Sequence, residues 1–308
     1  MFFLPYKLDL CLKKIPFLTI IVMLICLVIY IKQANNEQDF VQKTDQFCMA
    51  KRTNFERMVL KKALGDSSPQ RCVALMNELS TADDPQKHIA AYSEKSERIA
   101  GYTPQDSHDY MQRFLNKEYS RYRDAVPPLT TQQLWYSPHT WDPVTMLTSN
   151  FAHGSWDHIL GNLLYFFIFG AAVELIIGSA AYFVVILVLS FGTSLSYSIA
   201  MMNVTDALPT VGLSGVVMGM IAMLSYFMPS SKILCFYWFL IKIGVVGVST
   251  WILALLYIGI DTYTLITVEE MGGINLVAHV SGAAIGFLLA LALFRRHKAR
   301  ISVEYDIY

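Results

Sequence analysis

Long uncharged, mostly apolar runs occur near the beginning of the chain and throughout its second half. A helix that spans a bilayer needs about 20 apolar residues, so each run predicts a membrane span or part of one. The runs are residues 15–31, 159–173, 175–205, 207–231, 243–260 and 271–294. The third run can contain the end of one helix, a turn at Gly178-Ser179 and a complete second helix. The pattern therefore predicts six transmembrane helices.

Composition and charge refine this picture. Hydrophobic residues make up 54% of the 308 residues and charged residues 16%, a balance that indicates a polytopic, all-α membrane protein. Lysines and arginines beside the spans mark the cytoplasmic side. They are Lys7, Lys13, Lys14, Lys232, Lys242, Arg295, Arg296, Lys298 and Arg300. We therefore expect both termini to be cytoplasmic, as an even number of spans requires.

Two apolar stretches allow more than one interpretation. The run 15–31 follows a basic leader, as in a cleaved signal peptide, but it is longer than the usual core of about 7–15 residues and lacks a small-residue cleavage site before Lys32. We interpret it as a retained signal anchor. The segment 235–240 is too short to cross a bilayer, so we expect an interfacial helix there.

A polar segment covers residues 32–140, which this topology assigns to the extracytoplasmic side. Its basic and acidic residues are balanced, so it offers no basic surface for nucleic acid. Apolar residues at helical spacing, such as Phe55 and Val59, predict a small helical domain that ends at Pro127-Pro128. A disordered tether is the alternative.

Cysteine usage adds one open question about this segment. Cys48 and Cys72 both lie in it, whereas the other three cysteines lie in or beside predicted spans. An extracytoplasmic compartment permits disulfides. Two cysteines alone leave open whether they pair.

Four polar side chains interrupt or open the apolar runs, and no neighbouring charge explains two of them, Ser214 and His279. Ser214 lies in Gly-Leu-Ser-Gly (212–215), and His279 lies near the start of the last span in Ala-His-Val-Ser-Gly (278–282). His158 and Asn162 are four residues apart, on one face of a predicted helix. Polar groups at membrane depth are costly and by default mark functional sites.

Small residues accompany the serine and the histidine on their own helices. Taken alone, their spacing is typical of a helix-packing face. Two such faces in contact would bring a serine hydroxyl within hydrogen-bond reach of an imidazole, and in the predicted topology both groups lie near the external surface. The packing residues are Gly215, Gly219, Gly282 and Gly286.

These residue types suit acyl transfer. A neutral imidazole activates a serine hydroxyl, while an amide and a second imidazole can donate to an oxyanion. Asp261 closes the fifth span and is no obvious third member, so we expect a Ser214–His279 dyad oriented by packing. The sequence has neither a His-Glu-x-x-His zinc motif nor a pair of membrane aspartates, which argues against metallo- and aspartic proteases.

In combination, these motifs resemble the rhomboid family of intramembrane serine proteases. The matching segments are Phe-Ala-His-Gly-Ser-Trp-Asp-His-Ile-Leu-Gly-Asn (151–162), Gly-Leu-Ser-Gly (212–215) and Ala-His-Val-Ser-Gly-Ala-Ala-Ile-Gly (278–286), in family order. The resemblance implies that Ser214 is the nucleophile, His279 the base, and His158 and Asn162 donors of the oxyanion hole together with the Ser214 amide. It also implies cleavage of transmembrane or juxtamembrane segments of other membrane proteins, without metal or cofactor.

The predicted protein is thus a six-helix, rhomboid-like bundle in a bacterial-type inner or plasma membrane. Its parts are a cytoplasmic N-terminus (1–14), a first helix (15–31), an extracytoplasmic insertion (32–140), a catalytic membrane core (141–294) and a basic cytoplasmic tail (295–308).

Two other functions compete with the proteolytic one. An inactive rhomboid-like protein that binds and escorts membrane clients usually lacks the nucleophile or base, and both are present here. A channel or transporter would be expected to carry charged or paired polar residues along a pathway. The sequence favours the endopeptidase.

Overall fold

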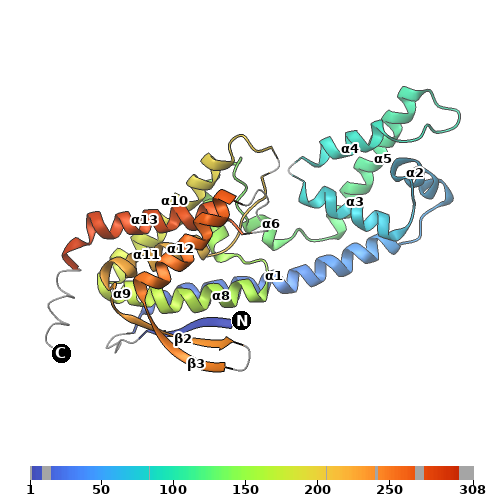
Figure 1. The fold of residues 1–308 in the computed structure, drawn as a ribbon. Helices are drawn as coiled ribbons and strands as arrows, with labels where there is room; N and C mark the ends of the chain where they lie inside the picture. The colour runs from blue at the N-terminus through green and yellow to red at the C-terminus, as the bar shows by residue number, and fades with distance from the viewer. Residues whose placement is uncertain are drawn as a thin grey trace. The chain divides into compact units, whose positions relative to one another are not determined.

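The computed structural model of the protein describes residues 2–8, 15–82, 84–205, 207–239, 242–267 and 274–297. The chain divides into two compact units, one made of Met1–Ile31 with Leu134–Tyr308 and the other of Lys32–Gln133. Each unit has its own hydrophobic core (Figure 1). Several basic residues used to predict the topology lie outside the described residues; they are Lys13, Lys14, Lys298 and Arg300.

The first unit, which we call the membrane unit, is mostly helical, as predicted. Among the residues that the structure describes, five helices are long and apolar enough to cross a membrane: Phe17–Met49, Trp156–Ile177, Ser179–Met201, Thr250–Thr267 and Leu276–Leu293. The first of these is α1, and the last three are α10, α12 and α13. The second, Trp156–Ile177, consists of α8 (Trp156–Tyr165), η2 (Phe166–Gly170) and α9 (Ala171–Ile177) in series. The predicted turn at Gly178 is confirmed, because α9 ends at Ile177 and α10 begins at Ser179.

A shorter apolar helix, α11 (Ser214–Phe227), lies at the centre of this unit. Every residue from Gly215 to Leu224 is buried. A helix that is apolar on all sides is stable only when protein or lipid surrounds it. The surrounding helices therefore provide most of the environment of α11, and its 14 residues give it a length of about 21 Å.

The buried carboxylate of Glu174, in α9, links α9 to the beginning of α1. It accepts hydrogen bonds from the backbone nitrogens of Leu18 (2.9 Å) and Thr19 (2.8 Å), and from the hydroxyls of Thr19 (2.7 Å) and Ser179 (2.6 Å). Since α1 begins at Phe17, the two nitrogens belong to its first turn, where N–H groups have no partner within the helix. The negative charge also lies at the positive end of the helix dipole.

The membrane unit also contains a three-stranded antiparallel sheet, which the all-α prediction did not include. Strands β1 (Phe2–Leu8), β2 (Lys232–Phe239) and β3 (Lys242–Ser249) pair in the order β1-β2-β3. The interfacial helix predicted over 235–240 is wrong for residues 235–239, which belong to β2, while residue 240 lies outside the described residues. In the apolar run 243–260, the helix begins only at Thr250. Aromatic and β-branched residues dominate β2 and β3, and these residues favour a pleated, half-buried surface.

The second unit, which we call the polar unit, is a helical domain and not the disordered tether considered as the alternative. It contains the second half of α1 with α2 (Asn54–Leu64), α3 (Pro69–Thr81), α4 (Pro85–Glu94) and α5 (Pro104–Ala125); α6 (Thr130–Leu134) follows them. Thr53, Ser68 and Thr103 cap α2, α3 and α5, each accepting a hydrogen bond from a backbone nitrogen of the first turn. Such caps stabilise a helix by about 1 kcal/mol each.

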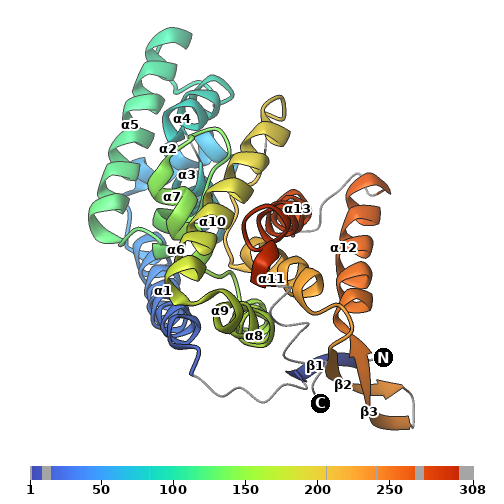
Figure 2. The ribbon, with the colours of Figure 1, turned by 90° about the vertical axis from the view of Figure 1, so that its left-hand side faces the viewer.

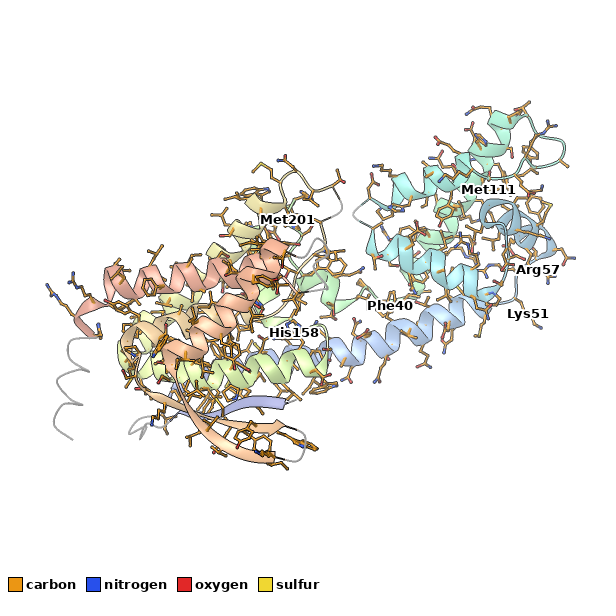
Figure 3. The ribbon with its side chains drawn as sticks, in the orientation of Figure 1. Phe40, Lys51, Arg57, Met111, His158 and Met201 are labelled. Atoms are coloured by element: carbon orange, nitrogen blue, oxygen red, sulfur yellow. A yellow bond between two sulfur atoms is a disulfide. The ribbon has the colours of Figure 1, made fainter. Side chains whose placement is uncertain are left out.

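The polar unit has an apolar core and a covalent link. Its buried residues include Phe40 of α1 and Met111 of α5, both labelled in Figure 3. The sequence left the pairing of Cys48 and Cys72 open, and the structure joins them in a disulfide between α1 and α3. The two ends of the unit also meet, because Asn36 donates to the Pro128 carbonyl (3.2 Å) and accepts from the Thr130 nitrogen (2.6 Å).

Candidate active site

Ser214 is the first residue of α11, and a constrained loop leads into it. Gly212 has a φ of +121°, a conformation that only glycine adopts readily. Its nitrogen donates a 2.8 Å hydrogen bond to the Ser149 carbonyl, while Thr210 and Tyr136 form an antiparallel bridge just before it. The loop is thus held from two sides, which fixes the start of the helix and the serine on it.

His279 lies in the first turn of α13 (Leu276–Leu293). Asn275 caps this helix, since its side-chain oxygen accepts a 2.9 Å hydrogen bond from the Ala278 nitrogen. The imidazole Nδ1 lies 2.7 Å from Oδ2 of Asp261, a residue near the end of α12 (Thr250–Thr267). The expectation that only packing would orient this imidazole is wrong, because a carboxylate from the neighbouring helix does so.

Glycines bring α11 and α13 into backbone contact (Figure 2). A Cβ atom added to Gly282 would overlap the Gly215 carbonyl, and one added to Gly286 would lie 2.7 Å from the Cα of Gly219. Any side chain at these positions of α13 would push the helices apart. The four glycines that the sequence marked as packing residues therefore face each other in two pairs.

A cavity of about 860 Å³ in the membrane unit is lined by all four candidate residues, Ser214, His279, His158 and Asn162. They come from three helices, α11, α13 and α8. Figure 3 labels His158, which lines this cavity together with Met201 of α10. Within the described part of the chain, no hydrogen bond joins the Ser214 hydroxyl to His279.

His158 and Asn162 lie against the loop that precedes Ser214. A Cβ atom added to Gly212 would lie 2.8 Å from Nε2 of His158 and 3.6 Å from Nδ2 of Asn162. Asn162 is buried, and among the described residues its Nδ2 has no hydrogen-bond partner. A buried amide donor without a partner is costly in a folded protein, so this group is available for a ligand.

A second imidazole lies beside His158, outside the spans. The rings of His153 and His158 are in edge contact, with centroids 5.2 Å apart. Burial, together with the nearby His158, lowers the pKa of His153 to about 4. His153 is therefore neutral near neutral pH and adds no positive charge to the site.

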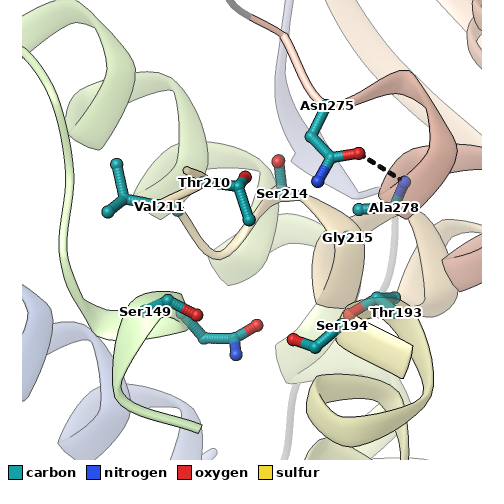
Figure 4. Close-up of a pocket in the computed structure, with 11 residues that line it drawn as sticks. Ser149, Thr193, Ser194, Thr210, Val211, Ser214, Gly215, Asn275 and Ala278 are labelled. Atoms are coloured by element: carbon teal, nitrogen blue, oxygen red, sulfur yellow. Dashed lines mark hydrogen bonds between the residues drawn. The ribbon is translucent and has the colours of Figure 1, made fainter. Parts of the chain in front are cut away.

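A small polar cavity of about 20 Å³ adjoins Ser214, and Figure 4 shows hydroxyl and amide groups around it. Its polar lining residues are Ser149, Asn150, Thr193, Ser194, Thr210, Ser214 and Asn275. A space of this size with several polar partners is sufficient for one water molecule.

Apart from Ser214, the sequence had not singled out the polar side chains of this small cavity. One of them is Asn275, whose Nδ2 has no hydrogen-bond partner among the described residues. Thr193 and Ser194 lie in an uncharged run, where isolated hydroxyls often bond their own helix. Only the packing of the helices shows that these two hydroxyls line a cavity beside Ser214.

The chain matches a known protein family. The family model described as the Rhomboid domain matches residues 140–296, slightly more than half of the chain. No curated protein matches the chain. The matched segment includes the loop before Ser214, both glycine-paired helices and all four candidate residues.

Proposed function

The chain belongs to the rhomboid family, and from this membership we propose that it is an intramembrane serine endopeptidase. The observation that carries the proposal is the lining of one cavity by Ser214, His279, His158 and Asn162. A nucleophile, a base and two candidate donors from three different helices are the parts that acyl transfer requires.

In the first step, Oγ of Ser214 attacks the carbonyl carbon of the scissile peptide bond and transfers its proton to Nε2 of His279. The carbonyl oxygen becomes an oxyanion, which accepts hydrogen bonds from Asn162, His158 and the Ser214 backbone nitrogen. The unpartnered Asn162 amide supports this role, because a site built in advance avoids reorganisation during the reaction. Collapse of the intermediate breaks the C–N bond, and His279 donates its proton to the departing amine.

In the second step, water hydrolyses the acyl-enzyme. His279 removes a proton from the water, the hydroxide adds to the ester carbonyl, and the proton returns to Oγ of Ser214 as the new carboxylic acid leaves. Water is scarce within a bilayer, so a place for it near Ser214 is needed. The small polar cavity beside Ser214 is suited to hold that water.

The substrates we propose are transmembrane or juxtamembrane segments of other membrane proteins. A peptide bond inside a helix is shielded by its hydrogen bonds and side chains, so the helix must unwind before the serine can reach it. Segments with small residues at the cleavage point and helix-destabilising residues nearby fit this requirement. The protein needs no metal or cofactor for this chemistry.

The membrane topology we propose has six spans, with α11 as the fourth. Ser214 begins α11 and His279 lies in the first turn of α13. Both helices run from the outside inward, so the site lies near the external face. Both termini are then cytoplasmic, and residues 32–140 form an extracytoplasmic domain in a bacterial-type inner or plasma membrane. In chain order, the first helix (15–31) is followed by this domain, then by the membrane core (141–294) and finally by the basic tail (295–308).

The polar unit is proposed to influence which clients reach the site without joining the chemistry. Its two ends meet at Asn36 and Thr130, so the chain enters and leaves it at one point. A domain attached in this way can be removed or exchanged without stretching the remaining chain.

Proteolysis is tested by reconstituting the protein in liposomes with a library of single-span reporter proteins. We expect the wild-type protein to release cleaved reporters and Ser214→Ala to release none, with equal amounts of folded protein in both samples. Equal cleavage by both proteins would exclude Ser214 as nucleophile. Absence of cleavage together with stable binding of reporters by both would favour an inactive client-binding protein.

A further inference from the structure

The carboxylate of Asp261 is the group that holds His279 through a hydrogen bond. Its Oδ2 lies 2.7 Å from Nδ1 of the imidazole, and both side chains are mostly buried, with exposed fractions of 22% for Asp261 and 15% for His279. We propose that Asp261 positions His279 and stabilises its protonated form during proteolysis, so that the site works as a Ser–His–Asp triad. This inference rests on the proposed function.

The hydrogen bond determines which imidazole nitrogen serves as the base. A carboxylate only accepts, so Nδ1 carries the hydrogen and donates it to Asp261. In neutral imidazole, Nε2 is then the nitrogen with the free lone pair. Nε2 is the atom that must take the Ser214 proton, and the negative charge of Asp261 opposes the positive charge that the imidazole gains.

The surroundings of Asp261 show that this contact is specific. An unpaired carboxylate on a lipid-facing helix is costly, and α12 is mostly exposed in the membrane unit. Near the same end of α12, three threonine hydroxyls bond carbonyls of their own helix; they are Thr262, Thr264 and Thr267. Asp261 instead reaches across to α13.

The position of the pair agrees with a catalytic role. Asp261 is near the C-terminal end of α12, and His279 is near the N-terminal end of α13. In the proposed topology these ends lie at the same external face as Ser214. Among the described residues that line the cavity with His279, the other titratable groups are His158 and Asp157, both of α8. Asp261 is the carboxylate that lies within hydrogen-bond distance of the His279 imidazole.

The test compares Asp261→Asn, Asp261→Ala and Asp261→Glu with the wild-type protein. The rate constant for covalent labelling of Ser214 by a fluorophosphonate probe is measured from pH 5 to pH 10. Each rate constant is taken from the fraction of molecules that finally becomes labelled, so misfolded molecules do not contribute. Tyr263→Phe, an exposed side chain on the same helix, and Asp39→Asn, an exposed carboxylate of the polar unit, are the matched controls.

We expect Asp261→Asn to label about 10²- to 10⁴-fold more slowly near neutral pH, because an amide can donate to Nδ1 and so favour the wrong tautomer. Loss of the carboxylate also moves the acid limb of the profile to lower pH, since the protonated imidazole loses its partner. Asp261→Glu should recover part of the rate. Added formate should accelerate Asp261→Ala, and chloride at equal ionic strength should not. The controls should match the wild-type protein.

Failure of the proposed protease function and failure of the role of Asp261 would give different results. If the wild-type protein labels no faster than Ser214→Ala, the proposed protease function fails and the triad fails with it. If the wild-type protein labels at Ser214 but Asp261→Asn shows the same rate and the same pH profile, the protease stands and Asp261 has no role in positioning. A slow Asp261→Ala that formate does not accelerate, with an unchanged acid limb, would also overturn the inference.

Discussion

Substitution of Gly286 by alanine tests whether backbone contact between α11 and α13 assembles the site. The added Cβ would lie 2.7 Å from the Cα of Gly219 and 2.8 Å from its carbonyl carbon. Carbon atoms in favourable contact are about 3.5–4.0 Å apart. The obstacle is backbone and not a flexible side chain, so the two helices must separate by roughly 1 Å.

The expected cost follows from this separation. Overpacking of a close contact destabilises a protein by about 1–3 kcal/mol, and a displacement of about 1 Å between reacting groups lowers the rate by roughly 10²-fold. Since α11 carries Ser214 and α13 carries His279, Gly286→Ala should reduce both the melting temperature and the turnover. Gly282→Ala, one turn closer to His279, should reduce turnover at least as much.

The matched control is Gly259→Ala on α12, where an added Cβ meets nothing within 4 Å. Alanine is favoured over glycine in a helix by about 0.5–1 kcal/mol, so this variant should melt at or slightly above the wild-type temperature and remain active. The assay is a thermal melt in detergent combined with cleavage of a reporter in liposomes. If Gly286→Ala melts like Gly259→Ala and cleaves at the wild-type rate, the contact between the glycines does not assemble the site.

Three further predictions concern other parts of the molecule. Asn162→Ala should lower kcat by roughly 10- to 1,000-fold through loss of an oxyanion donor while leaving the melt unchanged; wild-type kcat would remove that role. Glu174→Leu should lower the free energy of unfolding by about 2–6 kcal/mol, because two backbone N–H groups of α1 lose their acceptor at about 1–3 kcal/mol each. Glu97→Gln, at an exposed position, is the control, and equal free energies of unfolding for the two variants would contradict the capping role. Deletion of residues 37–124 should preserve probe labelling at Ser214 but change the reporters that are cleaved, as read by mass spectrometry; an unchanged set would show that the polar unit does not select clients.

Much of the membrane unit follows from local patterns in the sequence. Apolar runs of sufficient length predict spans, and Gly178 between two such runs predicts the turn that the structure has. The glycines after Ser214 and His279 predict a close helix contact because small residues are what such a contact needs. Each of these signals lies within one segment of the chain, so it can be read without knowledge of the others.

The sheet and the Asp261 contact could not be predicted in this way, because each joins segments whose relation is set only by the fold. Strand β2 pairs with β1, more than 200 residues earlier in the chain, and a short apolar run such as 235–240 has no period that separates helix from strand. Asp261 was visible at the end of a span, but its distance from His279 depends on how α12 packs against α13. A titratable residue at the end of a span deserves comparison with every polar residue expected at the same depth.

The site of covalent modification by a fluorophosphonate tests the central claim most directly. The wild-type protein in liposomes is labelled near neutral pH, digested and analysed by mass spectrometry, with Ser214→Ala and His279→Ala treated in parallel. We predict a single adduct on Ser214, none in Ser214→Ala, and at least a hundredfold slower labelling in His279→Ala. An adduct on another serine, or a wild-type protein that stays unlabelled while a known serine protease in the same liposomes is modified, would contradict the account.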